Sequence, residues 1–275
     1  PTRPVRRLVV NADDFGRSAS INEAVIRAHR EGILTSASLM VNEPGCAEAV
    51  SLAKASPRLG VGLHLSLVCG RSALGPDAIP ALVNGEGRFA HSPLWSGWRY
   101  FFQPELESQL RAEIRAQFER FRATGLALDH VNGHLHMHLH PTVFGILMEE
   151  AGTLGIERLR LTRDPLWLNL RLAAGRLGYR LSHAFLFGCL AAWARPALRR
   201  RGIGHAQAVF GLLQNGQVDE DYVCQLLPRL PPGDSELYSH PSLTDCKDEF
   251  DALVSPRVRE WVSRLGIQLV RYQDF

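Results

Sequence analysis

The sequence predicts an α/β protein whose central sheet is parallel, and three observations lead to this prediction. Strand-like segments alternate with amphipathic helical segments along most of the chain, which is typical of a parallel sheet. The 275 residues are 45% hydrophobic and 21% charged, as expected of a chain that buries one large core. Acidic and histidine side chains stand at the ends of several strand-like segments, where parallel sheets form their sites.

The first half of the sheet is predicted from short apolar runs that end in polar or turn-forming residues. After the first run, apolar residues from Ile21 to Ala28 recur at helical spacing, and Gly32 is a suitable end for that helix. The expected strands are residues 8–12, 34–41 and 59–65, with a further helix over 47–54.

The second half of the chain contains two segments that interrupt the alternation. Residues 70–103 are rich in glycine and proline, and residues 163–204 read as a helical, apolar insertion. We therefore expect a single domain over residues 1–275 that carries both insertions. The other expected elements are helices over 105–122 and 142–152 and strands over 128–132, 156–161, 236–239 and 267–272.

Four histidines alternate after the strand expected at 128–132, namely His134, His136, His138 and His140. If the strand continues through them, all four imidazoles lie on one face, because successive strand side chains point to opposite faces. Imidazole is the commonest protein ligand for transition metals, so a metal role is favoured. Alternate strand residues are ~6.6 Å apart, and the four cannot all bind one ion. His136 and His140 are either partners of the ligands behind the metal or merely polar, and the sequence does not decide between the two.

Asp14, His64 and His134 are the candidate metal ligands, since each stands at the end of a different expected strand. An Asp-His-His set leaves an open position for water on a catalytic ion. Two imidazoles and a carboxylate favour one zinc ion, while cobalt, nickel and magnesium are compatible. Taken singly, Asp13-Asp14 is more often a solvated turn and His64 a core histidine. Their shared placement favours a site.

A hydrolytic site also needs groups that move protons. Asp13 is adjacent to the candidate ligand Asp14 and is the candidate base. His240, which follows the strand expected at 236–239, is the best candidate for the acid. These residues fit the hydrolysis of an amide or an ester. A non-catalytic metal-binding protein and a metal-dependent phosphoesterase are the competing interpretations.

Four motifs resemble the YdjC/ChbG family of carbohydrate deacetylases, and the resemblance extends from residue 7 to residue 272. The motifs occur in the same order as in the family: NADDFG at residues 11–16, GLHL at 62–65, the alternating histidines that end at Pro141, and His240-Pro241. The resemblance implies an irregular (β/α) barrel related to polysaccharide deacetylases. It also implies metal-dependent removal of an acetyl group from an N-acetylated sugar.

The same resemblance implies roles for individual residues. Asp14, His64 and His134 match the family's metal ligands and Asp13 its base, while His138 competes with His240 for the acid role. Within the family, residues 131–138 look most like the hopanoid-biosynthesis-associated (HpnK-like) branch. That branch implies the N-acetylglucosaminyl headgroup of a hopanoid lipid as substrate, with a soluble N-acetylated oligosaccharide as the alternative. Many members carry Asp where this chain has Asn132, so a charged partner to the site is absent at that position.

The positive charge of the chain is concentrated in residues 163–201. This segment holds eight of the 31 basic side chains and one of the 28 acidic ones, so the rest carries 23 basic and 27 acidic side chains. The segment also contains Trp167, Phe185, Phe187 and Trp193. Arginines interleaved with aromatic and aliphatic residues are typical of a segment that lies on anionic lipid, whereas a helix pair packed on the barrel is the alternative.

Charge and cysteine content suggest where the protein works. A formal net charge of +3 is too small to indicate a nucleic-acid partner. The five cysteines are far apart and form no CxxC pair, which favours a reducing compartment. No signal peptide is visible at the start of the chain. We expect a cytoplasmic protein, with peripheral contact to the inner face of the membrane if the substrate is a glycolipid.

Overall fold

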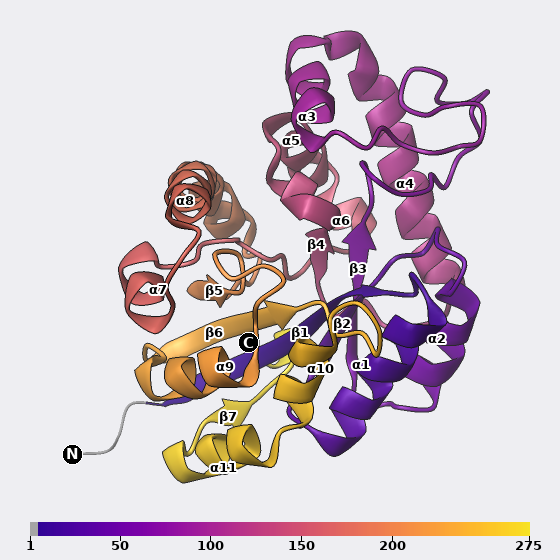
Figure 1. The fold of residues 1–275 in the computed structure, drawn as a ribbon. Coiled ribbons are helices and arrows are strands. Elements are labelled where there is room, and N and C mark those ends of the chain that lie inside the picture. Colours follow the sequence, from indigo (N-terminus) through magenta and orange to yellow (C-terminus); the bar gives the residue numbers. More distant parts are fainter. Residues whose placement is uncertain (1–4) are drawn as a thin grey trace.

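The computed structural model describes residues 5–275, and its centre is a curled sheet of parallel strands (Figure 1). The spatial order is β4-β3-β2-β1-β6-β5, and β7 pairs with the first part of β1. The longest strand, β1, therefore lies in the middle of the sheet. The strands are β1 (Arg6–Phe15), β2 (Ser36–Leu39), β3 (Gly60–Leu65), β4 (Val131–Gly133), β5 (Ala208–Phe210), β6 (Gly233–Ser239) and β7 (Gln268–Leu269).

An extended segment, residues 158–163, bridges the two edges of the sheet. The amide of Val131 in β4 donates to the carbonyl of Arg158 at 3.0 Å, and the amide of Arg160 donates to the carbonyl of Val131 at 3.0 Å. At the other edge, the amide of Val209 in β5 donates to the carbonyl of Arg163 at 3.0 Å. The prediction of an irregular (β/α) barrel is therefore confirmed, with the strand expected at 156–161 reduced to this bridging segment.

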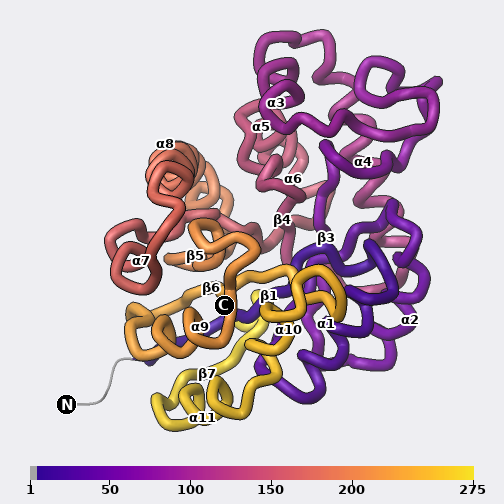
Figure 2. Tube along the Cα trace, viewed as in Figure 1, coloured from indigo at the N-terminus to yellow at the C-terminus, as the bar shows by residue number. Residues whose placement is uncertain are grey.

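Helices surround the sheet and lie between consecutive strands, as the alternation in the sequence predicts (Figure 2). No helix within residues 5–275 combines the length and hydrophobicity needed to cross a bilayer. The helices are α1 (Ala19–Glu31), α2 (Cys46–Lys54), α3 (Pro93–Phe102), α4 (Glu107–Ala123), α5 (Pro141–Glu149), α6 (Ala151–Leu154), α7 (Leu166–Leu172), α8 (Leu177–Arg201), α9 (Glu220–Leu226), α10 (Lys247–Val254) and α11 (Pro256–Leu265). Short 3₁₀ turns, η1 to η4, cover Pro104–Leu106, His134–Leu139, Leu227–Arg229 and Tyr272–Asp274.

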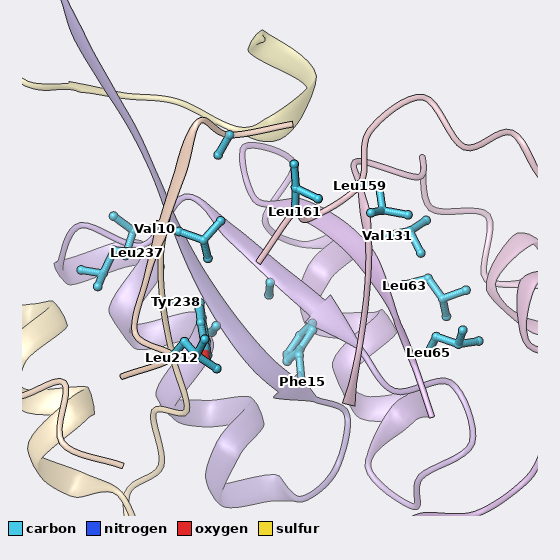
Figure 3. Packing of buried hydrophobic residues seen from close by; sticks show 14 of the residues in the cluster. Val10, Phe15, Leu63, Leu65, Val131, Leu159, Leu161, Leu212, Leu237 and Tyr238 are labelled. Atoms are coloured by element: carbon cyan, nitrogen blue, oxygen red, sulfur yellow. The ribbon is translucent and has the colours of Figure 1, made fainter. Parts of the chain in front are cut away.

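The two faces of the curled sheet differ in chemistry. Apolar side chains of the strands, such as Val10, Leu63 and Leu237, are fully buried in the hydrophobic core (Figure 3). Polar side chains from the same strands hydrogen-bond to one another between neighbouring strands; Asn11 of β1, for example, donates to Ser38 of β2 at 2.9 Å. The barrel interior therefore holds a polar network, while the apolar side chains form the core. This arrangement places charged groups directly below the strand ends.

The alternating histidines do not continue strand β4, which corrects the expectation that all four lie on one strand face. The chain enters the 3₁₀ turn η2 at His134, and Leu135 (φ 49°) and His136 (φ 57°) take left-handed conformations. Left-handed backbone turns the direction of successive side chains, so the period of two is lost. The four imidazoles consequently point to different partners.

The organisation as one domain with insertions at 70–103 and 163–204 stays a prediction, and residues 1–4 of that domain lie outside the described residues. The first of these ranges contains α3, and the second contains α7 and the whole of the long helix α8. Both ranges contribute helices that line the cavity described below.

Candidate metal centre

Asp14, His64 and His134 meet at one end of the curled sheet, as the sequence predicts. Asp14 Oδ1 lies 3.1 Å from His134 Nδ1 and 3.3 Å from His64 Nε2. One potential ligand atom from each residue lies within 4.8 Å of the other two, and all three side chains are buried. Two nitrogens and one oxygen at such separations can bind a single divalent ion.

The fold brings these residues together because they stand at the carboxyl ends of parallel strands. Asp14 is near the end of β1, His64 near the end of β3, and His134 directly after β4. Asp14 adopts φ 63°, a left-handed conformation that Asp tolerates better than most residues and that often marks functional sites. Its other oxygen, Oδ2, accepts from Arg17 Nη1 at 2.7 Å, so Oδ1 is left facing the histidines.

The hydrogen bonds of His64 fix which nitrogen faces the site. Its Nδ1 lies 2.7 Å from Asn132 Oδ1, and the amide nitrogen of Asn132 donates to Asp13 and Ser38. Those two acceptors orient the amide, so Nδ1–H of His64 donates to Asn132 and the lone pair is on Nε2. His64 Nε2 is buried and makes no hydrogen bond. An unpartnered, deprotonated ring nitrogen is what a metal ion requires, and the donor set therefore fits the implied metal.

Charge in the site is arranged to keep both aspartates ionised. Burial raises the pKa of Asp14, but its contacts with the imidazoles of His134 and His64 outweigh burial and hold the pKa well below the usual range. Burial likewise raises the pKa of Asp13, and the charge and hydrogen bonds of the Arg160 guanidinium outweigh that effect, so this pKa is also lowered. Two neighbouring carboxylates are therefore available as anions at neutral pH.

Asp13 is held by a buried arginine that sequence reasoning missed. Arg160 donates from Nη1 to Asp13 Oδ2 at 2.7 Å and from Nη2 to Asp13 Oδ1 at 2.9 Å. Arg160 also donates to Glu236, which accepts from Tyr272 on the other side. Asn11 and Asn132 complete the donors to Asp13 Oδ1, at 2.8 and 3.0 Å. The signal in the sequence was an arginine inside the strand expected at 156–161.

His240 lies in the same cavity as Asp13, whereas His138 does not line it. The side chain of His240 is 28% exposed, and its Nδ1 is 4.0 Å from Glu249 Oε2. Glu249 is buried and also accepts from the His240 amide, at 2.5 Å. His138, by contrast, is fully buried and donates from Nε2 to the carbonyl of Arg160 at 2.9 Å. Burial lowers the pKa of His138 to about 3, so it stays neutral.

The remaining two histidines of the run border the cavity without joining the cluster of potential ligands. His136 Nε2 is 3.0 Å from the hydroxyl of Tyr238, and His140 Nε2 donates to the carbonyl of Gly97 at 2.9 Å. His140 thereby fastens the turn to α3. The sequence left the roles of both residues open, and the structure places both beside the site.

A cavity of about 540 Å³ opens over the cluster. Asp13, His64, His134 and His240 form its polar part. The rest of its wall is mostly apolar and comes from α3, the turn η2 and α8, with Trp98, Leu186 and Phe187 among the contributors. A small polar site inside a larger apolar cavity is typical of a site for an organic ligand.

Comparisons with known proteins relate the chain to carbohydrate deacetylases. A carbohydrate deacetylase of Geobacillus stearothermophilus is 30% identical over 284 aligned positions, which cover 98% of both chains. One of Brevibacillus brevis is 46% identical over 145 residues, covering 53% of this chain and 55% of that relative. A chitooligosaccharide deacetylase of Proteus mirabilis is 39% identical over 148 residues, 52% of this chain and 54% of that one. These last two matches therefore span about half of each relative.

The fold is shared with a solved structure from Enterococcus faecalis V583, a proposed cellobiose-phosphate cleavage protein. The TM-score is 0.74, with 22% sequence identity and 98% of both chains covered. The family model of the YdjC-like proteins matches residues 7–264. The chain therefore belongs to the YdjC-like family.

Proposed function

We propose that this protein is a metal-dependent hydrolase that removes the acetyl group from an N-acetylated amino sugar. The observation that carries the proposal is the cluster of Asp14, His64 and His134, which opens into one cavity with Asp13 and His240. The names of the relatives, which are carbohydrate deacetylases, support the same reaction.

Asp14, His64 and His134 would hold one divalent ion, and we favour zinc over magnesium because two of the three ligands are imidazoles. When bound, such an ion lowers the pKa of water and polarises an amide carbonyl. The protein itself orients the side chains that would bind the ion. Asn132 fixes the ring of His64, and Arg17 restrains the second oxygen of Asp14.

Asp13 is placed to take up a proton from the attacking water. Four donor contacts from Arg160, Asn11 and Asn132 fix its carboxylate and keep it ionised. His240 is placed to give a proton to the leaving amine of the sugar, since its imidazole is partly exposed in the cavity. Glu249 holds the backbone of His240 by accepting from its amide, which fixes the position of the imidazole in the cavity.

We propose a glycolipid as the finer substrate, with the N-acetylglucosaminyl headgroup of a hopanoid lipid as the specific candidate. The apolar walls of the cavity beyond the polar residues support this choice, because an unmodified sugar chain has little apolar surface to bury there. Deacetylation of soluble N-acetylated oligosaccharides is the second candidate. The chitooligosaccharide deacetylase among the relatives favours it.

The proposed place of action is the cytoplasm, at an anionic membrane surface when the substrate is a lipid. All five cysteines are free, which supports a reducing compartment. The competing interpretation as a non-catalytic metal-binding protein does not account for Asp13 and His240, which line the cavity beside the cluster.

Mass spectrometry of N-acetylated glycans and glycolipids, incubated with zinc-loaded protein, tests the proposed function. We expect a loss equal to one acetyl group, and expect it to disappear when a chelator is added. A panel that includes both chitooligosaccharides and N-acetylglucosaminyl lipids separates the two substrate classes. Unchanged masses for every amino sugar in the panel would reject the deacetylase assignment.

A further inference from the structure

The large exposed hydrophobic side chains of this protein are concentrated on three helices. Within residues 5–275, 14 such side chains are exposed, and 12 of them belong to α3, α7 and α8. Single exposed hydrophobic residues are ordinary, whereas a group of them indicates an interaction site. The ten on α3 and α8 are here called the apolar collar: Leu94, Trp95, Trp98, Phe101, Phe102, Leu177, Leu181, Phe185, Leu186 and Trp193.

The apolar collar adjoins the cavity over the metal centre. Leu94 and Trp98 of α3, together with Leu186 of α8, line the cavity itself. Neighbouring collar residues face outward; Phe185, for example, is 76% exposed and does not line the cavity. In Figures 1 and 2, α3 and α8 both lie above the sheet and are separate from each other. The two helices thus provide walls of the site and, on their outer sides, an apolar surface.

The charged side chains of the same three helices are all positive, and most of them stand near the end of α8. The helices contain seven arginines, one in α3, one in α7 and five in α8, and no acidic residue. Arg199, Arg200 and Arg201 are exposed at the end of α8. No acidic side chain of these helices can neutralise them. A partner that covers this surface must therefore supply negative charge as well as apolar contact.

We propose that the apolar collar docks this protein on an anionic lipid bilayer. Trp, Phe and Leu flanked by arginine are the side chains that interfacial segments use, with the rings among the lipid headgroups and the guanidinium groups on the phosphates. Docking would present the cavity to the membrane. The relevance of this docking to the substrate rests on the proposed function. The docking adds the place where the protein would meet a glycolipid substrate.

A second copy of this chain is a poorer occupant of the same surface. A twofold interface would bring the collar of one copy onto the collar of the other, and the charged side chains of the two collar helices are all arginines. Like charges facing each other across an interface oppose association. Anionic headgroups satisfy the charge and accept the aromatic rings, so the bilayer is favoured.

Co-sedimentation of zinc-loaded protein with vesicles tests the docking. We expect binding to vesicles that contain phosphatidylglycerol, weaker binding to pure phosphatidylcholine, and a decrease in binding as salt is raised. A collar variant, Trp95→Gln/Phe102→Gln/Phe185→Gln, should bind at least about tenfold more weakly. None of these three residues lines the cavity, and all are more than half exposed, so the variant should fold.

Matched controls separate the collar from general effects. Val5→Gln replaces an exposed hydrophobic residue outside the collar and should leave vesicle binding unchanged. Arg199→Gln/Arg200→Gln/Arg201→Gln should weaken binding to anionic vesicles about tenfold or more. Arg58→Gln/Arg229→Gln/Arg259→Gln removes the same charge elsewhere, and it should have a much smaller effect.

Vesicle binding and acetate release, measured on the same proteins, distinguish failure of the docking from failure of the proposed function. Acetate release from soluble di-N-acetylchitobiose should be unchanged in the collar variant, while release from an N-acetylglucosaminyl lipid in anionic vesicles should fall. Absence of vesicle binding by the active wild-type protein would overturn the docking. So would equal binding by the collar variant, or a dimer in solution that the collar variant dissociates. Vesicle binding without acetate release from either substrate would sustain the docking and reject the proposed function.

Discussion

Asn132 connects the candidate base to one of the candidate metal ligands. Its side-chain oxygen accepts from His64 Nδ1, and its side-chain nitrogen donates to Asp13 Oδ1. The resemblance to the YdjC/ChbG family indicates only that a charged residue is missing at position 132. The structure shows that a neutral amide suits it, because the side chain must accept on one side and donate on the other.

Replacing Asn132 by Ala should weaken zinc binding about 10- to 100-fold, since the ring of His64 loses the partner that fixes its tautomer. Metal competition with a chromogenic chelator measures the affinity. Asn132→Asp is the informative comparison: it restores the acceptor for His64 but sets a carboxylate against Asp13. Zinc affinity should then recover more than turnover. Unaltered affinity in Asn132→Ala would show that His64 needs no such support.

Asp13→Asn should keep the metal and lose the base. The amide retains the size of the side chain, and Arg160 keeps Glu236 as an ionic partner. We expect stoichiometric zinc and a decrease in kcat of roughly 10²–10⁴-fold, the usual size of a general-base contribution. Metal analysis and acetate release on the same sample measure both. Near-normal kcat would make Asp13 a structural partner of Arg160.

The site residues that the sequence predicts owe their placement to the strands, whereas those it does not predict owe their placement to contacts between side chains. Asp14, His64 and His134 follow strands and have chemically distinctive side chains, so their convergence was predictable from a parallel sheet. Arg160 and Glu249 act through contacts with Asp13 and His240, and the first of these spans 147 residues of chain. Periodicity and spacing carry no information on such contacts, because they depend on the curvature of the sheet.

At the scale of elements, the turn η2 shows where local patterning failed. Strict alternation of histidine with apolar residues predicts a strand, yet the chain needs a turn there to place His134 beside Asp14. Leu135 and His136 both adopt positive φ, which costs L-residues roughly 1–2 kcal/mol each. The tertiary contacts of the histidines, such as that of His140 with Gly97, overrule the local preference.

Substitution of Leu135 can measure this strain. Leu135→Gly and Leu135→Ala both remove the same partly exposed side chain, but only glycine is relaxed at φ 49°. We expect Leu135→Gly to be more stable than Leu135→Ala by about 1 kcal/mol, despite the greater flexibility of glycine in the unfolded chain. Thermal unfolding of the two variants provides the comparison. A more stable Ala variant would indicate that the turn relaxes in solution.

A buried acid with an unusual pKa, Asp164, lies just before helix α7. Asp164 is fully enclosed, and burial raises its pKa to about 7, although its Oδ2 accepts from the amide of Leu213. In the unfolded chain the pKa of this acid is close to the ordinary Asp value of 3.8. Between these values unfolding releases a proton, so the contribution of Asp164 to stability falls as the pH rises and levels off above about 7.

Asp164→Asn should therefore gain stability relative to the wild type as the pH rises from 4 to 8. The gain should be at most about 1.4 kcal/mol per pH unit. Denaturant unfolding of both proteins at pH 4, 6 and 8 tests this. The difference, rather than either curve, isolates Asp164 from other titrating groups. A difference that does not change with pH would place the folded pKa near the ordinary value.

At the scale of the whole molecule, the curled sheet explains both the site and its surroundings. Parallel strands deliver Asp14, His64 and His134 to one end, and the polar barrel interior fixes the groups behind them. The alternation of strands and helices was readable from the sequence. The closure through residues 158–163 and the exposure of α3 were not, because both depend on how distant segments pack.

The central claim is that one ion held by Asp14, His64 and His134 drives deacetylation. Titration of metal-stripped protein with zinc, while acetate release from di-N-acetylchitobiose and from an N-acetylglucosaminyl lipid is recorded, tests it most directly. We predict activity that rises to a break at one equivalent, no activity at any zinc concentration for Asp14→Ala, His64→Ala or His134→Ala, and a much smaller loss for His140→Ala. Full activity in the stripped protein, or retained stoichiometric zinc in His64→Ala and His134→Ala, would contradict the account.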